Sequence, residues 1–337
     1  MYDYHNPVLL HPSVNALVTN PDGTYVDVTF GGGGHSNAIL QKLSSKGRLI
    51  SFDQDEDTLT RAPKDPRFTL VNHNFQFTKQ YLEYLKAVPV DGILADLGIS
   101  SHQIDVGERG FAHRLNGPLD MRMNRFAART AAEVVNGYTE QDLLSVFSEL
   151  GEIKNSKTLV RNIVQSRQVT AIDSTFGLRD IAMKSAERGN EQQYLARVFQ
   201  ALRIEVNDEL GALKDFIMQS GLALRPGGKL VVISYHSLED RLVKHYFTHG
   251  RFEGEASKDI YGNVEHVPFV PHTRKPIEPG EEEKSRNPRA RSAKKYFASR
   301  LTRTLMKQTS SVRIATTTPC LRPRPPRAKA ILLSDSK

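Results

Sequence analysis

The chain has very little of what several protein classes require. Its 337 residues include one cysteine, Cys320, which excludes an intrachain disulfide framework and a Cys-x-x-Cys zinc site. No stretch approaches the roughly 18 consecutive apolar residues that a membrane-spanning helix needs. The start of the chain, Met1–His5, lacks the basic residues and apolar run of a secretory signal. We therefore exclude an integral membrane protein and expect a reduced, cytoplasmic chain that holds no metal.

Acidic residues are scarce in one part of the chain only. Residues 284–337 hold 15 Lys and Arg against a single acid, Asp335, a net charge of +14, whereas the remainder has a net charge of −6. A basic arm on an acidic body is common in proteins that contact nucleic acid, because Lys and Arg neutralise phosphates and release counterions. Residues 300–337 are also poor in large apolar side chains. We expect a basic tail there that either stays disordered or contacts RNA.

Short apolar runs alternate with segments of helical spacing. The runs that predict strands are residues 24–30, 48–52, 68–71, 90–95 and 228–234, with a last strand around 292–299. Helices are expected over 37–43 and 77–85 and from Ser237 onward. Strands that alternate with helices predict an α/β fold, in which a mostly parallel sheet is covered on both faces.

The pattern changes between about Ser100 and Asn207. Apolar residues recur there every three or four positions, and no run typical of a strand appears. We interpret this segment as a helical insertion. The expected domains are 1–104 with 206–299 for the sheet, 105–205 for the inserted helices, and 300–337 for the tail.

A turn of four glycines, residues 31–34, follows the first predicted strand. Asp53 ends the next strand, 22 residues after Gly31. Glycine lets the backbone approach a ligand closely, and an acid at that place accepts hydrogen bonds from a ribose diol. Because ligands of such sheets bind beyond the carboxyl ends of the strands, Asp27, Gly31, Asp53 and Asp96 are candidate ligand-binding residues.

Dinucleotide binding is the main alternative for this edge. The Gly-x-Gly-x-x-Gly pattern would need glycine at Ser36, and Asp27 has no evident role beside a pyrophosphate. An acid on the first strand suits a ligand that presents an amino group and a sulfonium. The remaining alternative is a glycine turn that serves packing alone.

Seven motifs occur in a fixed order along the chain. They are HNPVLL at 5–10, GGHS at 33–36, DGILADLGISS at 91–101, GPLDMRM at 117–123, RVFQALRI at 197–204, SLEDR at 237–241 and NPRARS at 287–292. In these motifs the chain resembles the ribosomal RNA small-subunit methyltransferase H family, also called MraW. The resemblance extends from His5 to about Ser299. Asn116 and Asn124 depart from the family, which usually has Asp at both positions.

The resemblance implies a Rossmann-like class I methyltransferase domain interrupted by a helical substrate-recognition domain. It implies transfer of a methyl group from S-adenosylmethionine to N4 of a cytidine in the decoding region of bacterial 16S rRNA. The small ribosomal subunit is then the partner, and a monomer and a dimer both remain open. The implied cofactor contacts are Gly33, Gly34, His35, Asp53, Phe75, Asp96 and Gln103.

Three residues are candidates for the catalytic chemistry. Cytosine N4 is a weak nucleophile because its lone pair is delocalised into the ring, so a group that accepts an N4 hydrogen would assist transfer. Asp96 is the first candidate, although it would serve equally as a cofactor ligand alone. His236 and Asp240 follow the last strong strand at the same edge. Alternatively, Ser237 and Asp240 form a helix-capping box and need no other role.

Residues 105–130 are locally basic. We expect Arg109, Arg114, Arg122 and Arg125 to contact rRNA phosphates, with some of them paired to nearby acids such as Asp105, Glu108 or Asp120. Two other functions stay open from the residues alone. One is a non-catalytic RNA-binding ribosome-assembly factor on a methyltransferase fold, and the other is a nicotinamide-dependent oxidoreductase, which Asp27 and Ser36 disfavour.

Overall fold

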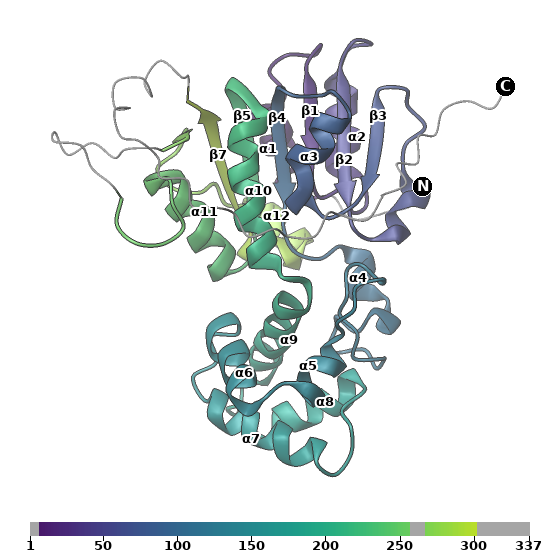
Figure 1. Ribbon diagram of the computed structural model, residues 1–337, viewed down its shortest axis with the longest axis vertical. Helices are drawn as coiled ribbons and strands as arrows, with labels where there is room; N and C mark the ends of the chain where they lie inside the picture. Colours follow the sequence, from purple (N-terminus) through teal and green to yellow (C-terminus); the bar gives the residue numbers. More distant parts are fainter. Residues whose placement is uncertain (1–6, 257–266, 302–337) are drawn as a thin grey trace, which may run out of the picture. The chain divides into compact units, whose positions relative to one another are not determined.

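The computed structural model describes residues 7–256 and 267–301 (Figure 1). The predictions for the tail beyond residue 301 lie outside these ranges. Within them, no helix is long and apolar enough to cross a bilayer. The strands are β1 (Thr24–Asp27), β2 (Arg48–Asp53), β3 (Phe68–Asn72), β4 (Val90–Asp96), β5 (Leu224–Ser234), β6 (Phe269–Pro271) and β7 (Lys294–Arg300).

Helices make up most of the remaining described chain. The α-helices are α1 (Leu10–Leu17), α2 (Gly34–Lys42), α3 (Thr78–Tyr84), α4 (Ser101–Asp105), α5 (Ala131–Gly137), α6 (Glu140–Ser145), α7 (Ser156–Arg167), α8 (Thr175–Met183), α9 (Glu191–Asn207), α10 (Glu209–Ala223), α11 (Ser237–His249) and α12 (Glu281–Arg286). Short 3₁₀ turns are η1 (Glu56–Arg61), η2 (Phe75–Phe77), η3 (Gly107–Arg109) and η5 (Pro288–Ser292), and η4 (Val146–Leu150) is a π-helical turn.

The seven strands form one sheet in the order β3-β2-β1-β4-β5-β7-β6. The first five strands are parallel, and β7 is antiparallel to both of its neighbours. This confirms the predicted α/β fold with a mostly parallel sheet. The chain order reverses between β1 and β4, which is the place where open α/β sheets bind their ligands.

The chain divides into two compact units. One comprises Gln54–Thr58 and Gly98–Asp215, and the other comprises Asn6–Asp53, Leu59–Leu97 and the chain from Phe216 onward. We call them the helical unit and the sheet unit. The division falls within α10 and directly after β2.

The core of the sheet unit lies on both faces of the sheet. On one face, α1 and α2 bury Leu17 and Ile39 against Tyr25 and Leu49 of the strands. On the other face Phe52 of β2 meets Tyr81 of α3, with ring centroids 6.1 Å apart. Figure 1 shows α3 and the adjoining part of α10 in front of the strands. Because successive side chains of β2 meet helices on opposite faces of the sheet, its four central residues are all buried.

The helical unit has a separate apolar core. It is built by α5 to α9, and its central side chains include Phe147, Leu159, Leu178 and Leu202. Within Gly98–Asp215, all of which is described, there is no strand, only an isolated bridge between Pro118 and Ser174. The three- and four-residue spacing of the apolar residues thus predicted the character of this segment correctly.

Candidate functional site

The glycine turn after β1 is fixed by contacts that exclude larger residues. Gly33 has a φ of +79° and caps α2, and a Cβ on Gly34 would lie 2.1 Å from the ring of Pro7. The backbone N–H of Gly31 donates to Oδ2 of Asp53 over 2.8 Å. Asp53 at the end of β2 therefore holds the turn that begins at the end of β1. These predicted residues lie together at the carboxyl edge of the sheet.

Asp27 is buried completely at the same edge. Its carboxylate accepts hydrogen bonds from the Ser36 hydroxyl at 2.7 Å and from the backbone N–H of Thr29 at 3.1 Å. Burial raises the pKa of Asp27 to about 6, although these hydrogen bonds oppose the shift. Since none of its surface is exposed, Asp27 in this structure fixes α2 to β1 and has no open side for a ligand. The direct ligand contact predicted for Asp27 stays a prediction, which would require Ser36 or Thr29 to give way.

Asp96, the last residue of β4, is the partly exposed acid of this edge, with 21% of its side chain accessible. Its Oδ1 accepts a hydrogen bond of 2.7 Å from the Tyr235 hydroxyl, and its backbone N–H donates to the Thr29 hydroxyl over 2.7 Å. Burial raises the pKa of Asp96 to about 7, the Tyr235 hydrogen bond lowers it in part, and the charges of Asp27 and Glu239 raise it further. Asp96 is thus able to gain and lose a proton near neutral pH.

His35 faces Asp96 from the first turn of α2. Its Nδ1 lies 3.6 Å from Oδ2 of Asp96, and its side chain is 5% exposed. Burial lowers the pKa of His35 to about 4, so the imidazole is neutral near pH 7. Its Nε2 is buried without a hydrogen-bond partner among the described residues. A buried polar atom in this state is costly unless a further group meets it.

Two further predicted cofactor residues lie in different units. Phe75 belongs to the sheet unit, where its ring packs edge-on against Phe216 with centroids 5.5 Å apart. Gln103 belongs to the helical unit. There it completes a capping box with Ser100, and its Nε2 donates to Oδ2 of Asp55 over 2.7 Å. The cofactor contacts predicted for Phe75 and Gln103 stay predictions.

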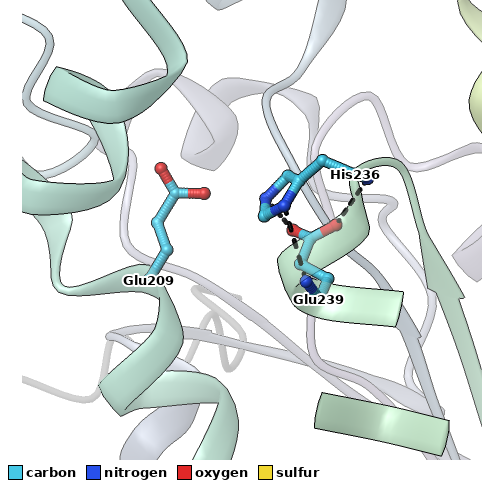
Figure 2. A group of neighbouring side chains, drawn as sticks. All are labelled: Glu209, His236 and Glu239. Atoms are coloured by element: carbon cyan, nitrogen blue, oxygen red, sulfur yellow. Dashed lines mark hydrogen bonds and ion pairs between the residues drawn. The ribbon is translucent and has the colours of Figure 1, made fainter. Parts of the chain in front are cut away.

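The capping box at the start of α11 differs from the one expected at Ser237 and Asp240. His236 is the N-cap, and the carboxylate of Glu239 accepts hydrogen bonds from the backbone N–H groups of Tyr235 and His236. The His236 ring also lies 3.1 Å from Oε1 of Glu239. Figure 2 marks the contacts between these two residues with dashed lines. The box is therefore shifted by one residue from the prediction. Glu209, also drawn in Figure 2, is paired with Arg203 of its own unit at 2.7 Å.

Asp240 is bound to β7. One carboxylate oxygen accepts from the Lys294 ammonium at 2.9 Å, and the other accepts from the Tyr296 hydroxyl. These contacts tie α11 to the antiparallel strand and account for Asp240 without a substrate. The capping contact occupies Nδ1 of His236, whereas its Nε2 is buried without a hydrogen-bond partner among the described residues. A direct catalytic role for either residue stays a prediction, and Asp96 is the acid whose environment fits one.

Burial corrects one of the predicted RNA contacts. Arg109 is 3% exposed, and its guanidinium donates to Asp55 at 2.7 Å and to Asp57 at 2.8 Å. It also donates to the backbone carbonyls of Arg122 and Met123. Arg109 is therefore a structural residue of the helical unit and presents no donor to a phosphate. Sequence reasoning missed this because Asp55 and Arg109 are 54 positions apart.

The other arginines are more accessible. Arg114 is 58% exposed and Arg125 is 46% exposed, whereas Arg122 is held by both oxygens of Asp120 and is 23% exposed. Arg114 pairs with Asp105, so the predicted pairing of some arginines with Asp105 and Asp120 is confirmed. Arg114 and Arg125 remain able to present donors to RNA.

Tyr235 is the site residue that the sequence analysis overlooked. It follows β5 directly, and strand ends at this edge were already the expected source of functional side chains. The position of Tyr235 at a strand end could have identified it from the sequence, but we chose its neighbour His236 instead. With Tyr235 included, the edge offers a carboxylate with a pKa near neutrality, a neutral imidazole and a glycine turn, which suits proton acceptance beside a bound ligand.

Comparison with known proteins gives the family. A sequence model described as the MraW methylase family matches residues 3–301. The chain is 52% identical over 299 residues to "Ribosomal RNA small subunit methyltransferase H" of Flavobacterium johnsoniae, covering 89% of this chain and 98% of that protein. It is 52% identical over 300 residues to the protein of the same name from Cytophaga hutchinsonii, covering 88% and 99%.

Similarity to solved structures is distant. A putative rRNA methylase from Clostridium thermocellum aligns with 86% of this chain and 95% of its own, at 11% identity and a TM-score of 0.38. Sequence similarity, in contrast, extends over nearly all of the described residues at about half identity. The chain belongs to the MraW methylase family.

Proposed function

We propose that this protein transfers a methyl group from S-adenosylmethionine to the exocyclic N4 of a specific cytidine in the decoding region of bacterial 16S rRNA. Membership of a methylase family and the names of its relatives support S-adenosylmethionine-dependent methylation of small-subunit rRNA. The structural observation that carries the finer proposal is Asp96. A carboxylate with a pKa of about 7 ends β4, at the switch point of the sheet.

The residues of the sheet edge fit the cofactor. Gly33 and Gly34 leave no room for a side chain at the start of α2, so only the backbone of the turn borders this edge and a ligand is able to approach it closely. Asp53 follows the second strand, where ribose-binding acids stand in sheets of this kind. The negative charges of Asp53 and Asp96 suit a ligand with an amino group and a sulfonium. When bound, the cofactor supplies the electrophilic methyl group.

Asp96 is the proposed acceptor of the N4 proton. Accepting a hydrogen bond from N4–H returns electron density to the nitrogen, and the same carboxylate takes up the proton as the N–C bond forms. Tyr235 holds Oδ1 of Asp96, which leaves Oδ2 as the oxygen for the base. His35, neutral and fixed in α2, lies on the Oδ2 side and limits how that oxygen turns.

The sheet edge also has to exclude water and orient the two reactants. Methyl transfer from a sulfonium is an in-line displacement, so most of the rate gain comes from holding sulfur, carbon and nitrogen collinear. Phe75, packed on Phe216, gives that edge an apolar wall. Arg114 and Arg125 of the helical unit are the proposed contacts to rRNA phosphates, which position the RNA without reading its sequence.

The proposal is tested by the product. Small ribosomal subunits from a strain lacking the gene are incubated with the protein and the cofactor, and the rRNA is digested and analysed by mass spectrometry. We expect one new N4-methylcytidine. Asp96→Asn should reduce turnover by roughly 10²–10⁴-fold, the usual range for a general base. A methyl group on another base or atom would refute the proposal, and RNA binding without transfer would identify an assembly factor instead.

Cofactor binding has a separate test by calorimetry with S-adenosylhomocysteine. Asp53→Ala should weaken binding by roughly 10- to 150-fold, the loss expected for a hydrogen bond to a charged group. Asp65→Ala is the matched control, because Asp65 is a partly exposed acid of the same unit paired with Arg67. Equal affinities in the two variants would remove Asp53 from the cofactor site.

A further inference from the structure

The most exposed aromatic side chain of the described residues lies in the helical unit. Phe126 is 82% exposed. It stands in the turn between Met123 and α5, with Arg125 directly before it and Arg129 three residues after it. A single exposed apolar residue is ordinary on a protein surface. The contacts of this turn, and the two arginines that are its neighbours in sequence, set Phe126 apart.

Hydrogen bonds from neighbouring residues order the backbone of the turn at residues 124–127. The side chain of Asn124 accepts a hydrogen bond of 2.9 Å from the backbone N–H of Phe126, and its backbone carbonyl accepts from Ala127 at 3.0 Å. Arg122 donates to the carbonyl of Ala127 at 2.7 Å, while Asp120 fixes Arg122. The ring is thus displayed on a turn whose backbone is already ordered, so that binding a ligand there costs little further entropy.

The base of the turn is anchored in the unit as well. Asn207, the last residue of α9, accepts from the backbone N–H of Met123 at 2.8 Å and donates to the carbonyl of Met121 at 2.8 Å. Asn124, which stands where the family usually has Asp, orders the turn through its side-chain bond to the backbone of Phe126. These bonds use the backbone of the turn and leave the Phe126 side chain exposed.

Two half-exposed arginines lie within three residues of Phe126 in the sequence. Arg125 is 46% exposed and uses one nitrogen for Asp57, at 3.2 Å. Arg129 is 52% exposed and pairs with Glu205 at 3.1 Å. A guanidinium has five donors, so each side chain keeps outward donors for a further anion. An aromatic face with cations beside it is the arrangement by which proteins hold an unpaired base and its phosphates.

We propose that Phe126 is a stacking platform for an unpaired base of the RNA substrate, and that Arg125 and Arg129 bind phosphates next to that base. This deepens the proposed function, on which it rests for the substrate being RNA. Stacking is indifferent to base identity, because every base has a π-face. Phe126 therefore supplies affinity and register, while the selection of the cytidine takes place elsewhere.

The test measures RNA binding by the full chain through fluorescence anisotropy, with a short fluorescein-labelled single-stranded oligoribonucleotide. Phe126→Ala should weaken binding by roughly 5- to 150-fold, the range for one stacked base. Phe126→Tyr should retain the wild-type affinity and Phe126→Leu should not. Tyr84→Ala, which removes an aromatic side chain that is 72% exposed in the sheet unit, is the control and should leave binding unchanged.

Salt separates stacking from charge. Phe126→Ala should lower the affinity by the same factor at every salt concentration, whereas Arg125→Ala and Arg129→Ala should each flatten the salt dependence by about 0.7 in the log–log slope. Wild-type affinity in Phe126→Ala, or full binding by Phe126→Leu, would overturn the proposal, as would an oligoribonucleotide that the wild type does not bind. Failure of the N4-methylcytidine assay with these binding results intact would refute the proposed function alone.

Discussion

Replacing Tyr235 by Phe removes one hydroxyl and keeps the ring. That hydroxyl donates to Oδ1 of Asp96 over 2.7 Å, and this hydrogen bond is the contact that lowers the pKa of Asp96 against the effect of burial. The variant therefore isolates one interaction of the proposed proton acceptor. Its pKa should rise, because the ionised carboxylate loses a donor while the protonated form loses less.

The size of the shift follows from the strength of such bonds. A hydrogen bond to a charged group contributes about 1.5–3 kcal/mol, and one pKa unit corresponds to about 1.4 kcal/mol. The pKa of Asp96, about 7 in the wild type, should move to roughly 8–9 in Tyr235→Phe. At pH 7 the ionised fraction then falls about 5- to 50-fold, and it recovers as the pH approaches 9.

The assay is the pH dependence of kcat/KM for methyl transfer to small ribosomal subunits, since this ratio reports the ionisation of the free enzyme. Activity should rise with pH through the pKa of Asp96, and in Tyr235→Phe the rise should be displaced upward by about 1–2 units. The other titratable groups that face Asp96 are His35, Asp27 and Glu239. His35 has a pKa of about 4 and Asp27 of about 6, so both have titrated below this range.

Tyr296→Phe is the matched control. It removes a second tyrosine hydroxyl that donates to a carboxylate, that of Asp240, in the same sheet unit. If Asp96 is the acceptor, this variant keeps the wild-type profile. A profile that shifts in Tyr296→Phe and stays in place in Tyr235→Phe would make Asp240 the acceptor. A profile unchanged in both variants would show that neither carboxylate takes the proton.

Two further predictions concern stability. In Asp27, a pKa raised to about 6 means that the folded state binds its proton more tightly than the unfolded state, so this stabilisation is full below about pH 4 and is lost as the pH rises through 6. Urea unfolding of Asp27→Asn should lack this decline of about 3 kcal/mol; an equal decline in both proteins would contradict the burial argument. Arg109→Ala should cost about 3–5 kcal/mol, because the buried carboxylate of Asp55 loses its cationic partner. Arg114→Ala, at a pair exposed to solvent, should change stability by less than about 1 kcal/mol. Similar losses in the two arginine variants would refute the distinction.

The sheet was predictable because its strands are local patterns. The runs at 24–30, 48–52 and 90–95 became β1, β2 and β4 with ends within a few residues, since buried parallel strands are apolar throughout. The three-residue β6 was not predicted. It is too short for periodicity to show, and it exists because β7 offers an open edge to pair with.

The sequence predicted where the acids of the site lie, but it predicted only part of what their side chains contact. Strand ends placed Asp27, Asp53 and Asp96 at one edge, as found. What each carboxylate contacts depends on residues far away in sequence, such as Tyr235, 139 positions from Asp96. The capping box shows the same limit on a smaller scale. Both Ser237 and His236 are able to cap a helix. Which of them is the N-cap depends on where the chain leaves β5 and α11 begins, and in the structure it is His236.

The arrangement of acids also explains why a cationic methyl donor suits this edge better than a neutral ligand. Burial and the charge of Asp27 both raise the pKa of Asp96 to about 7, so a large fraction of this carboxyl is protonated at neutral pH. A positive charge placed beside Asp96 removes the penalty and favours the ionised form, which is the form able to accept a proton from N4. Under the proposed function, binding of the donor therefore promotes ionisation of the base, because both act on the carboxylate of Asp96. The hydrogen bond from Tyr235 favours the same ionised form.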